Sequence, residues 1–326
     1  MDFLKGKSIL VTGGTGSFGR KFVQTLLTTT EAKRIIVFSR DEFKQSQMMS
    51  SIDDPGGKLR FFIGDVRDLD RLRMAFREVD FVVHAAALKQ VPALEYNPFE
   101  AVKTNIIGTQ NVITAAIEQG VEKVLLISTD KAANPANLYG ATKLCAERLM
   151  ISSNAYTTGR TRFAVVRYGN VIGSRGSIAE IIAQQKETGV VTLTHEDMTR
   201  FWITLDQGVQ LVLLALEKMQ SGEIFTPKVP SMKMKDFFAT MAPGCAIKVI
   251  GIRPGEKLHE VLVTTEEARH AKEYAGYYVI FPEHRWWSYQ EKYNDGDDLP
   301  PNFQYASNTN TEWFDEKSLK DLLLQL

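Results

Sequence analysis

The sequence predicts an α/β fold, in which a Rossmann-like doubly wound parallel sheet is joined to a smaller mixed α/β lobe. Short apolar runs alternate with stretches of helical spacing through the first half of the chain, and a glycine-rich turn joins the first run to the first helix. After about Arg167 this alternation loosens. We therefore expect a first domain at residues 1–170 and a second lobe at residues 171–326, with some segments of the second returning to the first.

The apolar runs give the expected strands in order. They lie at residues 8–13, 34–39, 60–65, 80–86, 123–128 and 162–169. Runs that are apolar on both faces are typical of a parallel sheet covered by helices, and right-handed crossovers then wind the chain onto both faces. Helical spacing at residues 17–28 and 100–119 supplies two of the covering helices. Later in the chain the clearest strand is 221–228, the clearest helix is 231–241, and 294–304 reads as a surface loop.

Composition excludes several classes of protein. Lys plus Arg and Asp plus Glu both number 39 among 326 residues, which argues against a nucleic-acid binder or a polybasic membrane-surface protein. The most apolar helical run, 208–219, is too short to span a bilayer, and we expect a cytoplasmic protein. Two cysteines are too few for a disulfide framework. No metal is expected, because metal-ligand spacing is missing among His84, His195, His259, His270 and His284.

The turn after the first strand reads VTGGTGSFG. Gly14, Gly16 and Gly19 satisfy G-x-G-x-x-G, and Gly13, Gly16 and Gly19 satisfy the G-x-x-G-x-x-G variant. Glycine there permits a tight turn and a close approach of the backbone to a pyrophosphate at a helix start. The expected dinucleotide contacts in this turn are Gly13, Thr15, Gly16, Ser17, Phe18 and Gly19.

The residues at the end of the second strand indicate which dinucleotide binds. An NAD site carries an acid about 20 residues beyond the glycines, whereas this strand ends with Ser39 and Arg40. Arg40 can pair with a 2′-phosphate, and Lys44 can assist, so we expect NADP. Asp41 leaves NAD open, because it could accept the ribose hydroxyl, although its more ordinary role is to cap the next helix.

The next strand ends supply further cofactor contacts. Asp65 could accept from the adenine amino group and Val66 could pack on the ring. Ala85 and Ala86 are small enough to let the backbone pass close to a ligand. If the glycine turn were absent, ordinary packing at strand ends would explain these residues equally well.

The run STDKAANPANLYGATK, at 128–143, carries the catalytic signal. Tyr139 and Lys143 are four residues apart, so they share one face of a helix. An adjacent ammonium and a positive nicotinamide both favour the phenolate, which should lower the pKa of Tyr139 from its usual value near ~10. Directly upstream, Thr129, Asp130 and Lys131 place an acid beside an amine.

These motifs together resemble the extended short-chain dehydrogenase/reductases that act on nucleotide sugars. Within them SRDE, HAAALKQVP, STDKAANPANLYGATK, MTRFWIT and GIRPGEKLHE resemble the inverting UDP-N-acetylglucosamine 4,6-dehydratases, and the likeness runs from Ser8 almost to the end of the chain. The related dTDP-glucose dehydratases have Thr-Asp-Glu where this chain has Thr-Asp-Lys. The resemblance implies hydride transfer from C4 to NADP⁺, loss of water across C5 and C6, and return of the hydride to C6.

The resemblance also implies a role for each residue of the run. Tyr139 takes the O4 proton, Lys131 removes the C5 proton, and Asp130 protonates the leaving hydroxyl, while Thr129 binds a sugar hydroxyl. Lys131 would then need a lowered pKa and Asp130 a raised one, although the two could exchange roles. Inversion at C5 is implied by the family alone. Asn105 matches an asparagine that fixes the active-site helix through a water.

A UDP-sugar needs cations and polar contacts, which the resemblance places mainly in the second lobe. The candidates are Lys89, Asn170, Arg200, Arg253 and Glu256. A homo-oligomer is expected, a hexamer or smaller. Trp286 and Trp287 are adjacent, and either a subunit contact or a loop packed on the core would suit them.

Three alternatives remain at this level. A related dehydratase of capsular amino-sugar synthesis shares many of these blocks. A nucleotide-sugar 4-epimerase would use the same fold with NAD but needs no residue such as Lys131. A non-catalytic NADP-sensing protein of this fold typically lacks the Tyr-x-x-x-Lys pair that this chain keeps.

Overall fold

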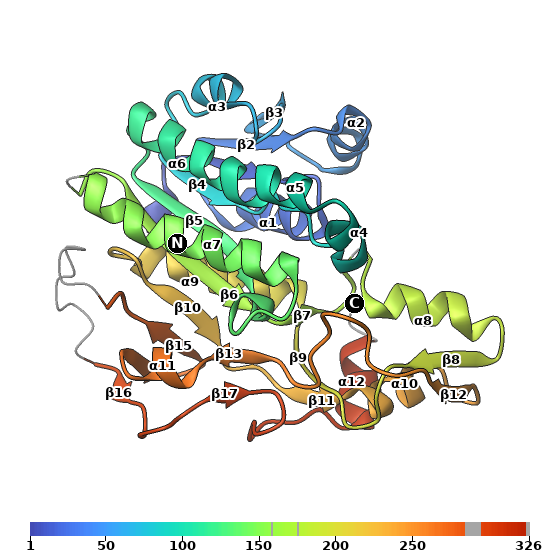
Figure 1. The fold of residues 1–326 in the computed structure, drawn as a ribbon. Helices are drawn as coiled ribbons and strands as arrows, with labels where there is room; N and C mark the ends of the chain where they lie inside the picture. Colours follow the sequence, from blue (N-terminus) through green and yellow to red (C-terminus); the bar gives the residue numbers. More distant parts are fainter. Residues whose placement is uncertain (158, 175, 284–294, 324–326) are drawn as a thin grey trace.

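The computed structural model describes residues 1–157, 159–174, 176–283 and 295–323. Its main feature is a ten-stranded sheet in the order β16-β14-β15-β10-β6-β5-β4-β1-β2-β3 (Figure 1). The strands from β3 to β10 in this order run parallel, and β15, β14 and β16 continue the sheet antiparallel. The order 3-2-1-4-5-6 is that of a dinucleotide-binding sheet, so the predicted fold class is confirmed.

The strands of this sheet are β1 (Ser8–Thr12), β2 (Arg34–Ser39), β3 (Leu59–Ile63), β4 (Phe81–His84), β5 (Lys123–Thr129), β6 (Arg162–Tyr168), β10 (Ile224–Pro227), β14 (Ala271–Tyr274), β15 (Tyr277–Ile280) and β16 (Asp297–Asp298). Most residues of β1, β2, β4, β5 and β6 are buried, as expected for strands covered on both faces. The six strands predicted in the first half all form, with ends that differ by at most two residues.

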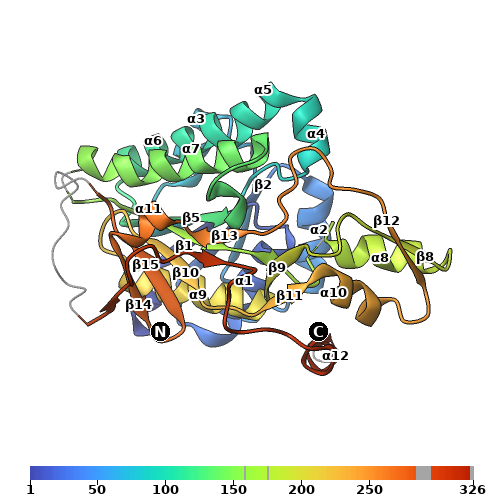
Figure 2. The same cartoon turned by 60° about the horizontal axis from the view of Figure 1, so that its bottom comes forward.

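Helices lie on both faces of the sheet. Figure 2 shows α3, α6 and α7 on one side and α1 and α9 on the other. The helices around this sheet are α1 (Ser17–Thr29), α2 (Glu42–Ser51), α3 (Leu69–Ala75), α4 (Val91–Tyr96), α5 (Pro98–Ala101), α6 (Gly108–Gln119), α7 (Leu138–Ser153), α9 (Leu205–Lys218) and α11 (Thr265–Ala268). The chain after residue 171 therefore contributes β10, β14, β15 and β16 to the first sheet, and α9 to its cover.

The predicted helix at 100–119 is interrupted. A π-helical turn at Val102–Ile107 lies between α5 and α6, and such turns occur often at functional sites. The helix expected at 231–241 also starts later than predicted, because Ser231–Lys233 pair with β9 as β11 and only Met234–Met241 are helical.

The smaller lobe has its own apolar cluster, which includes the stacked rings of Trp202 and Phe237. Its elements are β7 (Asn170–Val171), α8 (Ile178–Lys186), β8 (Val190–Leu193), β9 (Thr199–Ile203), β11, α10 (Met234–Met241), β12 (Ala246–Val249) and α12 (Glu316–Leu323). The strands β13 (Val261–Val263) and β17 (Tyr305–Ala306) form an antiparallel pair. In this pair β13 contacts the short helix η3 (Asp130–Ala132), which directly follows β5. Trp286 and Trp287 lie outside the described residues. No helix in the described ranges is long and apolar enough to cross a membrane.

Candidate active site

The glycine turn between β1 and α1 is built for close contact. Gly13 has φ +68°, and a Cβ there would lie 2.9 Å from the backbone nitrogen of Ala86. A Cβ on Gly19 would lie 2.5 Å from the Cα of Gly14, so only glycine at position 19 lets α1 pack this closely on the turn. Gly16 is the N-cap of α1, and Thr15, Ser17 and Phe18 lie in the same turn. The geometry fits a pyrophosphate held by backbone N–H groups at the start of a 13-residue helix.

The tip of β2 separates the two roles that Asp41 could have. Asp41 caps α2, because its side chain accepts from the backbone nitrogen of Lys44 and also pairs with the Lys44 ammonium at 2.8 Å. The predicted capping role is thus confirmed. The Arg40 side chain is 53% exposed and lies 3.6 Å from Asp65, while the Ser39 hydroxyl accepts from Gln45. Arg40 is therefore open enough at this strand end to reach an anionic ligand.

The ends of β3 and β4 lie beside this turn. The Asp65 carboxylate accepts from the backbone and the guanidinium of Arg67, so an adenine amino group would have to share it. Val66 is buried. Ala85 and Ala86 are held against β1, since their backbone nitrogens donate to the carbonyl and the hydroxyl of Thr12.

Helix α7 brings Tyr139 to the end of β5. A Cβ on Gly140 would lie 2.1 Å from the carbonyl oxygen of Lys131, so this glycine permits η3 to pack directly on the helix. Gly140 is not predictable from the sequence pattern, because its need for glycine arises only where η3 packs on α7. Asn137 caps the helix by accepting from the backbone nitrogen of Gly140.

The lysine of the Tyr-x-x-x-Lys pair is deeply buried. Lys143 donates to the carbonyl of Ile127 at 2.8 Å, which within the described chain leaves two of its three N–H groups for a ligand. Burial lowers the pKa of Lys143 to about 8, although the charge of Glu147 opposes the shift. An amine in this state can hold a ribose hydroxyl and exchange a proton near neutral pH.

The pKa of Tyr139 differs from the expectation. Burial raises it to about 12, and this effect outweighs the lowering by the Lys131 charge and by a hydrogen bond with Thr129. The expectation that the side chains of this protein lower the pKa of Tyr139 is therefore wrong. The sequence shows the neighbouring cation but not the depth of burial, which decides the sign here.

Asp130 and Lys131 form a tight pair at the end of β5. Asp130 is 0% exposed, and its Oδ1 accepts from the Lys131 ammonium at 2.9 Å. Burial raises the pKa of Asp130, with Lys131 acting against the shift. This is the direction that an acid role requires.

The expected lowering of the Lys131 pKa is wrong. Burial alone would lower it, but the charges of Asp130 and Glu260 outweigh burial and raise the pKa. The Glu260 carboxylate lies 3.5 Å from the ammonium. Glu260 was missed in the sequence because it lies in GEKLHE, far downstream, and only the fold brings it to Lys131.

The predicted substrate residues fall into two groups. Asn170 lies at the centre, with its Oδ1 3.5 Å from the Lys131 ammonium. Burial lowers the pKa of Lys89, the Glu180 charge opposes this shift, and the Lys131 charge adds to it. Arg253 and Glu256 lie in one turn, where the Glu256 carboxylate accepts from the backbone nitrogen of Arg253 at 3.3 Å.

Arg200 does not present a free guanidinium. Its NH1 donates to the carbonyls of Thr199 and Leu258, and its NH2 donates to the carbonyl of Lys257. The expected bidentate contact with a pyrophosphate is therefore wrong. Arg200 instead ties β9 to the segment that carries Glu260.

Asn105 lies in the π-helical turn and joins two parts of the site. Its amide accepts from the backbone nitrogen of Leu88 at 2.8 Å and donates to the Leu88 carbonyl and to Thr142 on α7. The contact with the active-site helix is thus direct, whereas the expectation placed a water between them.

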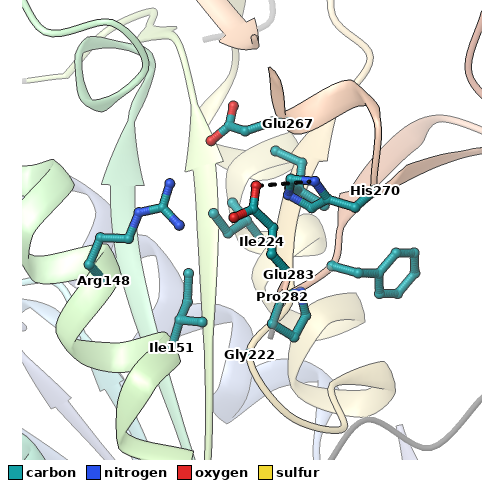
Figure 3. A pocket seen from close by; sticks show the side chains of 10 residues that line it. Arg148, Ile151, Gly222, Ile224, Glu267, His270, Pro282 and Glu283 are labelled. Atoms are coloured by element: carbon teal, nitrogen blue, oxygen red, sulfur yellow. Dashed lines mark ion pairs between the residues drawn. The ribbon is translucent and has the colours of Figure 1, made fainter. Parts of the chain in front are cut away.

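A small enclosed pocket lies elsewhere, between α7, β10 and α11 (Figure 3). His270 and Glu283 face each other across it at 3.6 Å. It has room for about one water, roughly 10 Å³, so it is no substrate site.

The chain matches the polysaccharide biosynthesis protein family over residues 9–282. It is 46% identical to an inverting UDP-N-acetylglucosamine 4,6-dehydratase of Campylobacter jejuni, across 98% of this chain and 97% of that protein. It is 39% identical to a UDP-glucose 4-epimerase of Rickettsia felis, across 98% and 96%. The solved structure of Pen from Bacillus thuringiensis is similar, with a TM-score of 0.90 and 38% identity over 99% of this chain and 98% of that chain. The chain therefore belongs to the polysaccharide biosynthesis family of extended short-chain dehydrogenase/reductases that includes the inverting UDP-N-acetylglucosamine 4,6-dehydratases.

Proposed function

We propose that this protein is a UDP-N-acetylglucosamine 4,6-dehydratase that inverts C5, an NADP-dependent hydro-lyase giving UDP-2-acetamido-2,6-dideoxy-L-arabino-hexos-4-ulose. The observation that carries the proposal is the pair of Asp130 and Lys131, an acid and an amine 2.9 Å apart beside Tyr139. An epimerase that oxidises and reduces C4 needs only the tyrosine and its lysine. Removing the C5 proton and the C6 hydroxyl needs a further base and a further acid.

The residues that would hold NADP follow the strand ends. The pyrophosphate would lie on Gly13, Thr15, Gly16, Ser17, Phe18 and Gly19, the 2′-phosphate on Ser39, Arg40 and Lys44, the adenine on Asp65 and Val66, and the nicotinamide ribose near Ala85, Ala86, Tyr139 and Lys143. When bound, NADP supplies the hydride acceptor for C4 and the hydride donor for C6.

The side chains then move protons at three atoms of the sugar. Tyr139 accepts the proton of O4 as the phenolate, and Lys131 and Thr129 favour that form because both lower the pKa of the phenol against the larger effect of burial. In the form of the pair whose single proton lies on Asp130, Lys131 accepts the C5 proton and Asp130 gives its proton to O6, which leaves as water. For inversion, C5 must be reprotonated on the face opposite to Lys131, so a donor other than this amine supplies that proton.

The substrate would be oriented by groups around this centre. Lys89, Asn170, Arg253 and Glu256 remain the candidates for the sugar and the UDP group, while Arg200 acts by fixing the segment at 257 and 258. We also propose that the protein acts as a cytoplasmic homo-oligomer, up to a hexamer. The product would enter pseudaminic acid synthesis for flagellin glycosylation, with capsular amino-sugar synthesis as the alternative.

The function is tested by incubating the protein with UDP-N-acetylglucosamine in D₂O and following the reaction by proton NMR. We expect a new C6 methyl signal, deuterium at C5 and no net change in NADP, and the C5 coupling reports inversion. A C4 epimer without a methyl signal would support an epimerase, as the Rickettsia relative is named. An unchanged sugar with bound NADP would support a non-catalytic protein.

Replacing Arg40 with alanine is expected to weaken NADP binding about tenfold and to leave NAD binding nearly unchanged. A hydrogen bond to a charged group contributes about 1.5–3 kcal/mol when well formed, and the exposed Arg40 should deliver the lower part of this range. Calorimetric titration with both cofactors measures the difference. Arg60→Ala on β3, whose side chain donates to the carbonyls of Gly57 and Leu59, is the control. An equal loss for both cofactors would contradict the assignment of Arg40 to the 2′-phosphate.

A further inference from the structure

A second carboxylate joins the acid and amine at the end of β5. Glu260 is 2% exposed and comes from the segment just before β13, in the second half of the chain. Resting on the proposed dehydratase function, we propose that Glu260 is a positioning residue of the elimination step, which fixes the orientation of the Lys131 amine and sets the pH range in which it works.

The geometry of Lys131 is the first support. A lysine ammonium has three N–H donors. Its nitrogen lies 2.9 Å from Asp130 Oδ1, 3.5 Å from Glu260 Oε1 and 3.5 Å from Asn170 Oδ1. These acceptors come from η3, from the segment before β13 and from β7. Three separate elements therefore hold the amine, and removing Glu260 would release it on one side.

Glu260 is itself held firmly. Its backbone nitrogen donates to the hydroxyl of Ser307 at 2.9 Å. Its carboxylate lies 3.4 Å from the Lys257 ammonium and 3.8 Å from Nε of Arg200. Arg200 also donates to the carbonyls of Lys257 and Leu258, so the whole segment is tied to β9. Burial, the fixed backbone and these ion pairs restrict where the carboxylate can move while Lys131 gains and loses a proton.

The charge of Glu260 acts on both reacting groups. It raises the pKa of Asp130, where burial is the larger cause, and it raises the pKa of Lys131, together with Asp130. Against it, the Arg200 charge lowers the pKa of Lys131, and Lys89 and Tyr139 lie near enough to sense the Lys131 charge. The anion of Glu260 thus favours retention of protons on Asp130 and Lys131.

The reactive form of this pair holds one proton between its two members. With a second proton Lys131 cannot accept from C5, and with none Asp130 cannot protonate O6. The two limbs of the pH profile therefore belong to the pair as a whole. Because Glu260 raises both pKa values, removing its charge should move both limbs to lower pH.

The test compares pH profiles of kcat for dehydration. Glu260→Gln is expected to move the whole profile down by about one pH unit, the low end of the effect of a charge at this distance. Glu260→Asp keeps the charge but moves it away from Lys131, so its pH profile should lie between those of the wild type and Glu260→Gln. Formation of reduced nicotinamide from C4, measured in a single turnover, should change little in both variants. Glu266→Gln, an exposed change on α11, is the control.

Each outcome decides the proposal. A uniform loss of kcat at every pH, with limbs in their wild-type places, would assign Glu260 a structural role only and overturn the proposal. If Glu260→Gln does not fold, Glu260→Asp decides, since a wild-type profile and kcat in that variant would also overturn it. Failure of the proposed function is seen separately, because the wild-type protein would then form no C6 methyl product at all.

Discussion

Replacing Lys131 with arginine is expected to stop dehydration while hydride transfer from C4 continues. A guanidinium can keep the ion pairs with Asp130 and Glu260 but stays protonated, so no base remains for the C5 proton. A positioned base contributes about 10²–10⁴-fold to such a step, and the rate of product formation should fall by that factor. The first half of the reaction depends on Tyr139 and Lys143, which the substitution does not remove.

The two halves can be measured separately. In a single turnover, Lys131→Arg should accumulate reduced nicotinamide, without a C6 methyl signal and without deuterium at C5. Lys143→Arg is the matched variant on α7, and it should form little reduced nicotinamide. If Lys131→Arg still exchanges the C5 proton with D₂O but does not dehydrate, Asp130 is the base and Lys131 the acid. Product formation at the wild-type rate would remove Lys131 from the mechanism altogether.

The sequence predicts those parts of the molecule that depend on local patterns. The buried strands, the glycine turn and the capping of α2 by Asp41 are each specified within a few residues of chain. The Tyr139 and Lys143 pair follows equally from helical spacing. These features are therefore found without knowledge of the fold.

The site was predicted less well where tertiary contacts decide. The pKa of Lys131 is raised because Glu260 arrives from a distant segment, and the pKa of Tyr139 is raised because burial outweighs the nearby charge. Arg200 looked like a phosphate ligand by its type, but β9 turns its guanidinium to the carbonyls of 257 and 258. In each case the residue type was informative, while the sign of the pKa shift or the hydrogen-bond partner depended on packing.

A buried ion network beneath the site carries the largest expected effect on stability. Arg167 on β6 is 0% exposed, and its five N–H donors bind Glu147 on α7, Glu267 on α11 and the carbonyl of Leu262. Arg167→Met would leave two buried carboxylates without their cation, which typically costs about 3–5 kcal/mol. We expect the free energy of unfolding to fall by that amount in chemical denaturation. Arg162→Met, an exposed arginine on the same strand, should change it little.

The pH dependence of this loss distinguishes an unpaired charge from a packing defect. Burial alone would raise the pKa of Glu267, but the Arg167 charge outweighs it, so the pKa lies below its usual value. In the wild-type protein Glu267 therefore contributes stability above the unfolded pKa, near ~4.3, and this is lost as the pH falls. Without Arg167, burial raises the folded pKa above that value, and the penalty exists only while the carboxylate is charged. The difference in the free energy of unfolding between Arg167→Met and the wild type should thus shrink as the pH is lowered from about 8 toward 5. A cavity or packing defect would instead give the same difference at every pH.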